Sequence, residues 1–101
     1  MAAVTPVPGN ASQITTGGTP VIAALPTVTG IIITNPASAT DQGIATAETL
    51  YVNPVGAAAL EANGTTFAIP PGGSWTLNFG QTTSTSVNAV TSGHKFSCIV
   101  F

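Results

Sequence analysis

The clearest pattern in the chain is an alternation of apolar and polar residues across residues 65–79, on both sides of the turn Pro70-Pro71-Gly72-Gly73. After the turn, one face carries Trp75, Leu77 and Phe79, and the other carries Ser74, Thr76 and Asn78. Before the turn, Phe67 and Ile69 alternate in the same way. A repeat of two residues is the period of a β-strand, so each segment is expected to bury one face. The prolines fix φ and the glycines permit positive φ, which favours a reversal of the chain between two strands.

Short apolar segments bounded by turn residues predict more strands elsewhere. They lie within residues 21–25, 28–34, 44–53, 85–91 and 95–101. The segment 28–34 is rich in β-branched residues and ends at Asn35-Pro36, and the strand ending LYVN stops at Asn53-Pro54. In the last segment, one face is predicted to carry Phe96, Cys98 and Val100, and the other Ile99 and Phe101.

The connecting segments are polar or ambiguous. Residues 36–43 and 80–84 are predicted to be polar loops, and residues 92–94 a turn. Residues 57–62 have a composition typical of helices and are followed by Asn63-Gly64, a possible helix stop, but a strand of small residues is an alternative. We expect at most a short helical turn there.

Roughly seven or eight short strands with turn signals between them, and no crossover helices, predict an all-β fold. Specifically, we expect one antiparallel β-sandwich, jelly-roll-like or Ig-like, over residues 21–101. Four aromatic residues are expected to dominate its core, each contributing on the order of 2–3 kcal/mol on burial. They are Phe67, Trp75, Phe79 and Phe96.

Residues 1–20 differ from the rest because proline, glycine, threonine and serine interrupt them repeatedly. They contain too little apolar surface to order themselves, so we predict an extended N-terminal arm with at most one weak strand near Ile14. The arm is expected to contact a neighbouring subunit. The alternative is that it packs on its own domain.

Charge is scarce, since only 4% of the residues are charged, against about a quarter in ordinary soluble domains. A basic patch is missing, so binding to nucleic acid is not expected. The N-terminus lacks the pattern of a signal peptide and no apolar run is long enough to span a bilayer, so no membrane partner is expected. A folded domain with so little charge has a tendency to associate, which predicts a surface covered by partners.

Candidate chemistry is sparse. The single histidine, His94, lies between Gly93 and Lys95 and is interpreted as an exposed turn residue. The single cysteine, Cys98, excludes an internal disulfide and is expected to be a small core residue, about 13 Å along the strand from His94. The isolated acids Asp41, Glu48 and Glu61 are interpreted as solvated. We therefore predict no enzyme activity and no catalytic, cofactor-binding or metal-binding residue.

The order of the motifs resembles one protein family. IIITNP is followed by LYVNPVGAAA, then by FAIPPGGSW, and finally by VNAVTSGHKFSCIVF. This order is similar to that in the small β-sandwich virion proteins of tailed bacteriophages, over about residues 20–101. The chain departs from the family pattern in the longer loop 36–49, which leaves the strand pairing there open.

The resemblance implies a structural protein of the virion with no enzyme activity, most simply a capsid decoration or accessory protein present in many copies. Its partners would be copies of itself and a major capsid protein or another virion protein. The alternatives are a head–tail, tail or spike component, or a carbohydrate-binding or receptor-binding sandwich. Glycan binding would then involve Tyr51 and the loops 36–43 and 80–84.

Overall fold

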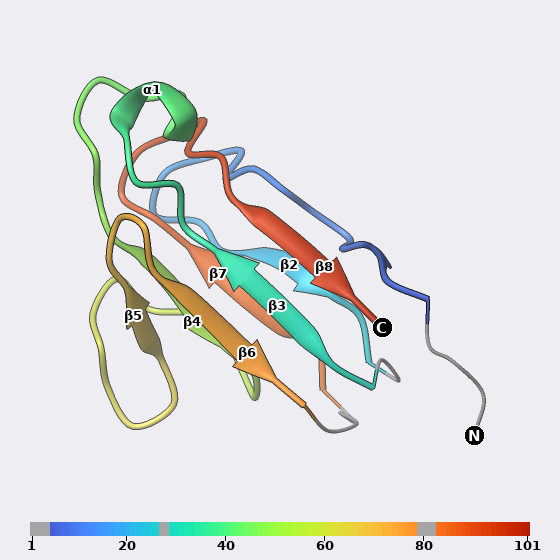
Figure 1. Ribbon diagram of the computed structural model, residues 1–101. Coiled ribbons are helices and arrows are strands. Elements are labelled where there is room, and N and C mark those ends of the chain that lie inside the picture. Colours follow the sequence, from blue (N-terminus) through green and yellow to red (C-terminus); the bar gives the residue numbers. More distant parts are fainter. Residues whose placement is uncertain (1–4, 27–28, 79–82) are drawn as a thin grey trace.

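The computed structural model describes residues 5–26, 29–78 and 83–101, and within them it shows two four-stranded antiparallel sheets packed as a sandwich (Figure 1). The first sheet contains, in spatial order, β1 (Val7–Pro8), β8 (Ser97–Val100), β3 (Ile31–Thr34) and β6 (Ser74–Leu77). The second contains β2 (Val21–Ala24), β7 (Thr85–Asn88), β4 (Leu50–Asn53) and β5 (Phe67–Ile69). The predicted all-β sandwich is confirmed.

β1 lies in the predicted arm and was not expected, whereas the other strands occupy segments predicted to be strands, although most are shorter than expected. β8 confirms its predicted faces, because Phe96, Cys98 and Val100 are buried while Ser97 and Ile99 are exposed. β6 alternates between exposed and half-buried positions along Ser74–Leu77. Period-two patterning therefore identified both the strands and the sides that they turn inward.

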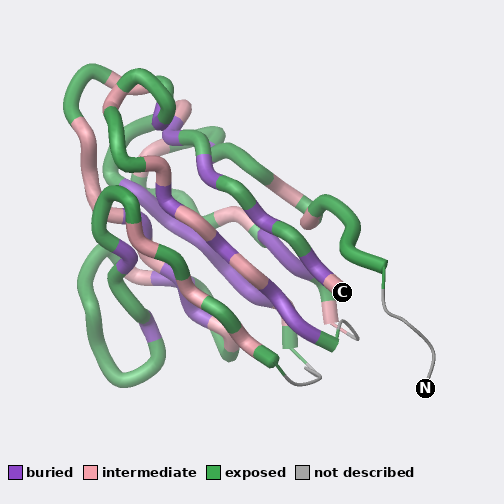
Figure 2. Tube along the Cα trace, viewed as in Figure 1, coloured by how far each residue is buried: buried purple, intermediate pink, exposed green. Residues whose placement is uncertain are grey.

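The core between the sheets is aliphatic, contrary to the prediction that four aromatic residues dominate it. Figure 2 shows the buried positions concentrated along the strands, and the largest fully buried apolar side chains are Ile14, Ile31, Ile33, Leu50, Val52 and Val87. Of the three aromatics that the structure describes, Phe96 alone is buried. Phe67 is 50% exposed, Trp75 packs on the edge of the core, and Phe79 lies outside the described residues.

The turn Pro70-Pro71-Gly72-Gly73 reverses the chain as predicted, but it carries the chain from one sheet to the other. It connects β5 of the second sheet to β6 of the first. Asn35 fixes the turn, because its N–H donates to the Gly73 carbonyl and its own carbonyl accepts from the Gly72 N–H. Gly72 has a φ of 83°, a conformation that favours glycine.

Residues 5–20 pack on the chain's own sandwich, the arrangement that we had considered as the alternative to a free arm. β1 pairs with β8, and Gln13 forms an isolated bridge with Lys95. Ile14 is completely buried in the core, and its N–H and carbonyl bond the turn that leads into β8. The weak strand expected near Ile14 is this bridge.

Two connecting segments differ from expectation. The predicted polar loop 36–43 contains a one-turn helix, α1 (Ala39–Gln42), which Ser38 caps at its start and Gly43 ends in a left-handed conformation. Residues 54–66 form neither the helical turn nor the strand considered for them, and instead cross the outside of the second sheet. There the Ser86 hydroxyl accepts from the Ala58 N–H, and the Asn88 amide donates to the Ala58 carbonyl.

Candidate functional site

Polar side chains gather at the end of the sandwich that carries α1. His94 lies at their centre and is completely buried, so its interpretation as an exposed turn residue was wrong. Around it lie Asn35 at the end of β3, Gln42 of α1, Glu48 before β4 and Thr91 after β7. Four segments of the chain therefore meet in this cluster, and Asn35 and Glu48 bond the imidazole ring directly.

Both ring nitrogens of His94 are hydrogen-bonded. Nε2 lies 2.8 Å from Asn35 Oδ1, and Nδ1 lies 3.0 Å from Glu48 Oε1. The Asn35 oxygen also accepts from the Gln42 amide at 3.0 Å, so it is an acceptor and Nε2 carries a proton. The Gln42 side chain then closes the cluster, because its oxygen accepts from the Glu48 N–H and its nitrogen donates to the Pro36 carbonyl.

Glu48 is held as a carboxylate by this arrangement. Burial alone would raise its pKa, but hydrogen bonds from His94 and Thr91 hold the pKa below its usual value of 4.5. Thr91 contributes its backbone N–H at 3.0 Å and its hydroxyl at 2.9 Å. The interpretation of Glu48 as a simply solvated acid was therefore wrong, whereas Asp41 and Glu61 are exposed as expected.

This cluster is arranged to hold the structure together and not to transfer a proton. A general base needs a free nitrogen within reach of a substrate proton, and both nitrogens of His94 are bonded inside the protein. The cluster instead satisfies buried polar groups and fastens α1 and the turn 91–94 to the ends of β3 and β4. Within the described ranges, no group of three histidine, cysteine, aspartate or glutamate residues is placed to hold a metal ion.

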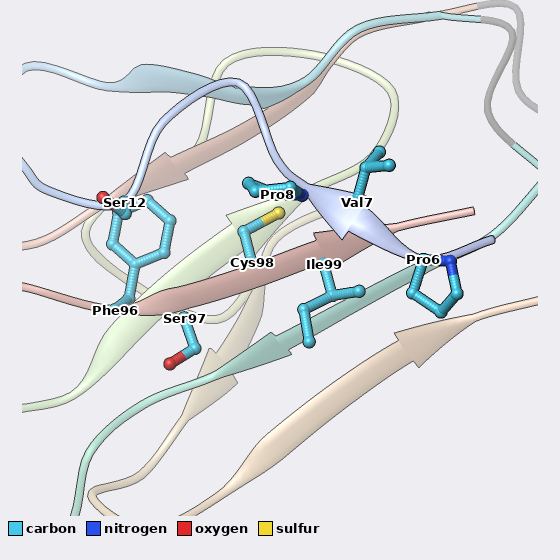
Figure 3. Close-up of a pocket in the computed structure, with 8 residues that line it drawn as sticks. All are labelled: Pro6, Val7, Pro8, Ser12, Phe96, Ser97, Cys98 and Ile99. Atoms are coloured by element: carbon cyan, nitrogen blue, oxygen red, sulfur yellow. The ribbon is translucent and has the colours of Figure 1, made fainter.

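A shallow groove of about 480 Å³ lies between the N-terminal segment and β8 (Figure 3). Pro6, Val7 and Pro8 form one side, and Phe96, Cys98 and Ile99 form the other. Burial raises the pKa of Cys98 to about 11, so its thiol stays protonated at neutral pH, and Sγ lies 3.5 Å from the Ala23 carbonyl oxygen. Cys98 is thus the small core residue that the sequence predicted, and the groove lacks an activated nucleophile.

The strands of both sheets contain no charged residues in the part of the chain that the structure describes. The charged residues of the chain all lie in the part that the structure describes, and none is in a strand: Asp41, Glu48, Glu61 and Lys95. The outer face of the first sheet consists of uncharged side chains in two rows: Ser97, Thr34 and Ser74, then Ile99, Ile32 and Thr76. Residues 54–66 cover part of the second sheet, but no described segment crosses this face of the first sheet.

Aromatic side chains occur beside this neutral surface. Phe67 of β5 and Trp75 of β6 form a tilted pair with ring centroids 6.1 Å apart, at the side of the sandwich where the two sheets open. Tyr51, the residue considered for glycan contact, is half-buried in β4. The loop 80–84, considered with it, falls largely outside the described residues.

Comparisons with protein-family models, with curated proteins and with solved structures found no match for this chain. Across the described residues, the structure also contains no helix with the length and apolar character needed to cross a membrane.

Proposed function

We propose that this chain is a non-enzymatic structural protein of a bacteriophage virion, a decoration or accessory protein that binds the capsid surface in many copies. The order of its sequence motifs supports this family of proteins, as set out above. The observation that carries the proposal is the uncharged outer face of the first sheet, which no described segment covers.

A solitary domain gains solubility from charged side chains on its exposed strands. Here the exposed positions of β6 and β8 are serine, threonine and isoleucine, and Ile99 is 42% exposed. Such a face can be covered by another protein at little cost, because no charge has to be desolvated. A repeating particle surface provides that cover for every copy.

A second candidate function is glycan or receptor binding by a sandwich on a virion or cell surface. The exposed part of Phe67, next to Trp75, favours it, because aromatic rings can stack on sugars. A glycan array read with the purified protein tests this alternative. Binding that is saturable and lost in Phe67→Ala supports it, and an array without signal contradicts it.

Particle binding is the direct test of the main proposal. We would purify particles of the phage whose genome encodes the chain and measure by mass spectrometry how many copies each contains. Particles lacking the protein would then be incubated with purified wild type, with Ser97→Glu and with Thr46→Glu. Ser97 lies on the neutral face and Thr46 is exposed in the loop before β4.

We expect wild type and Thr46→Glu to bind the particles, and Ser97→Glu to bind at least about tenfold more weakly, because it would bring a charge into the contact. The proposal would be contradicted if mass spectrometry found no copies of the protein in the natural particles. It would also be contradicted if Ser97→Glu and Thr46→Glu bound equally well.

A further inference from the structure

The strand β6 presents an outer edge at one side of the sandwich. β6 ends the first sheet and β5 ends the second, and the turn 70–73 joins them, so both edges lie on the same side of the sandwich (Figure 1). No described strand pairs with the outer side of β6. Natural proteins protect such edges with prolines, charges or bulges, and β6 contains none of these.

The pairing with β3 determines which backbone groups of β6 are free. The Asn35 N–H donates to the Gly73 carbonyl, which makes residues 35 and 73 a hydrogen-bonded pair. Because such pairs alternate along an antiparallel ladder, Trp75 and Leu77 direct their backbone groups to β3. The backbone N–H and carbonyl groups of Ser74 and Thr76 therefore point to the open edge.

The opposite side of the sandwich is protected. The Gly9 N–H donates to the Cys98 carbonyl, so the same alternation turns the backbone of Pro8 away from β8 and toward the open edge of β1. Proline has no N–H to offer there. The edge strand of the second sheet, β2, has a register irregularity between Ile22 and Ala24, which disturbs a regular edge.

We propose that β6 pairs antiparallel with β6 of a second copy of this chain, about a two-fold axis. Ser74 of each copy then exchanges backbone hydrogen bonds with Thr76 of the other, and the two Trp75 residues lie opposite each other. The first sheet continues across the axis into the second copy. This pairing identifies the surface through which copies of the chain associate. Its biological role rests on the proposed function.

Self-complementarity identifies the second copy as the partner. A two-fold axis brings the same strand from both molecules together in antiparallel orientation, so the free groups of Ser74 and Thr76 match each other without any other sequence. Charge does not oppose the contact, because no charged residue occurs between Glu61 and Lys95. The half-exposed Phe67 and Trp75 lie beside the edge and provide apolar surface that the second copy can cover.

The test compares two substitutions at one position. Thr76→Pro removes the outward N–H, whereas Thr76→Ala keeps it and removes only the side chain. We would measure the mass of the full chain by sedimentation over a dilution series, and follow the fluorescence of Trp75, the only tryptophan. Circular dichroism and thermal unfolding would show that each variant is folded, and Thr76→Lys would serve as a second edge variant.

We expect dimers for wild type and Thr76→Ala, and a dimer dissociation constant raised about tenfold or more in Thr76→Pro and Thr76→Lys. Trp75 emission should shift on dilution of wild type in step with its mass. A monomeric wild type, or edge variants that dimerise as well as wild type, would overturn the pairing.

Particle binding separates this inference from the proposed function. A monomeric wild type that binds particles would overturn the pairing and leave the proposed function standing. A dimer that depends on the β6 edge but binds no particles would support the pairing and count against the proposed function.

Discussion

The two sides of this sandwich are built in opposite ways. On the side of β1 and β2, the N-terminal segment closes the gap between the sheets, with Ile14 in the core and Asn10 bonded to the strand β2. On the side of β5 and β6, no described segment closes the gap, and Phe67 and Trp75 remain partly exposed. We call these the closed side and the open side.

The difference shows that neutrality alone does not make a surface available for contact. The closed side carries no charged residue in its strands either, but Pro8 and the irregular pairing of β2 disturb its edges. The open side offers intact backbone groups along β6. One chain thus protects one pair of strand edges and leaves the other pair able to associate.

The largest expected effect is the loss of the closed side. Deleting residues 1–20 removes Ile14 from the core and also removes β1, one of the two strands that pair with β8. From the sequence alone, we expected residues 1–20 to form an extended arm that contacts a neighbouring subunit. The contacts of Ile14 change that expectation, and we now predict loss of cooperative thermal unfolding, measured by calorimetry. A truncated protein that unfolds like the full chain would show that the closed side is dispensable.

Single substitutions on the two sides should lower the free energy of unfolding by different amounts. Ile14→Ala removes a completely buried side chain and should lower the free energy of unfolding by about 2–5 kcal/mol. Phe67→Ala removes a larger side chain that is already half exposed, so we expect a loss of about 1 kcal/mol. Chemical denaturation of both variants gives the comparison. Equal losses would mean that the open side contributes as much to stability as the closed side.

Acid should loosen the closed side selectively. The pKa of Glu48 is lower in the folded protein than its usual value of 4.5, so its contribution to stability is present above pH 4.5 and is lost as the pH falls through the folded pKa. Ile14 bonds the turn that holds His94. We therefore expect the protection factors for amide exchange at Ile14 and Gly93 to fall below pH 4.5 more than the protection factor at Leu77.

Glu48→Gln is the control for the acid effect. It keeps the size of the side chain and removes the titrating carboxylate, so the difference in exchange between the two sides should lose most of its dependence on pH. If Glu48→Gln shows the same acid dependence as wild type, Glu48 is not the group responsible.

The smallest expected effect on stability is that of Pro8→Ala. It restores an N–H at the open edge of β1 and should change the free energy of unfolding by less than about 1 kcal/mol. Its effect on association should be larger. Both edges of the first sheet can then pair, so we expect assemblies larger than dimers. Sedimentation of Pro8→Ala beside wild type measures this, and identical profiles would show that Pro8 does not protect the edge.

The strands and their inward sides could be predicted from the sequence because both depend on local alternation. The polar cluster could not be predicted in this way. His94 and Glu48 lie 46 residues apart, and neither has a local signal of burial, since His94 stands between a glycine and a lysine. The turn 70–73 was recognised as a reversal, but turn residues do not reveal whether the next strand joins the same sheet.

The N-terminal segment shows a related limit. Its proline and glycine content indicated correctly that it forms little regular structure, but composition does not show which surface such a segment covers. One isoleucine among polar residues is a weak signal in sequence. In the folded chain, Ile14 is completely buried in the core, and its backbone bonds Gly93 and His94 in the turn between β7 and β8.

The position of β8 also limits when this protein can fold. β8 lies between β1 and β3 in the first sheet, although it follows all the other described strands in the sequence. A nascent chain on the ribosome therefore holds β1 and β3 without the strand that joins them, and the first sheet can close only after residues 97–100 have emerged. Folding dominated by such distant pairings is slow, in the range of milliseconds to seconds. During that interval, exposed strands of neighbouring nascent chains can pair with β1 and β3 in place of β8. Translation rate and chaperone access should therefore influence the yield of native protein.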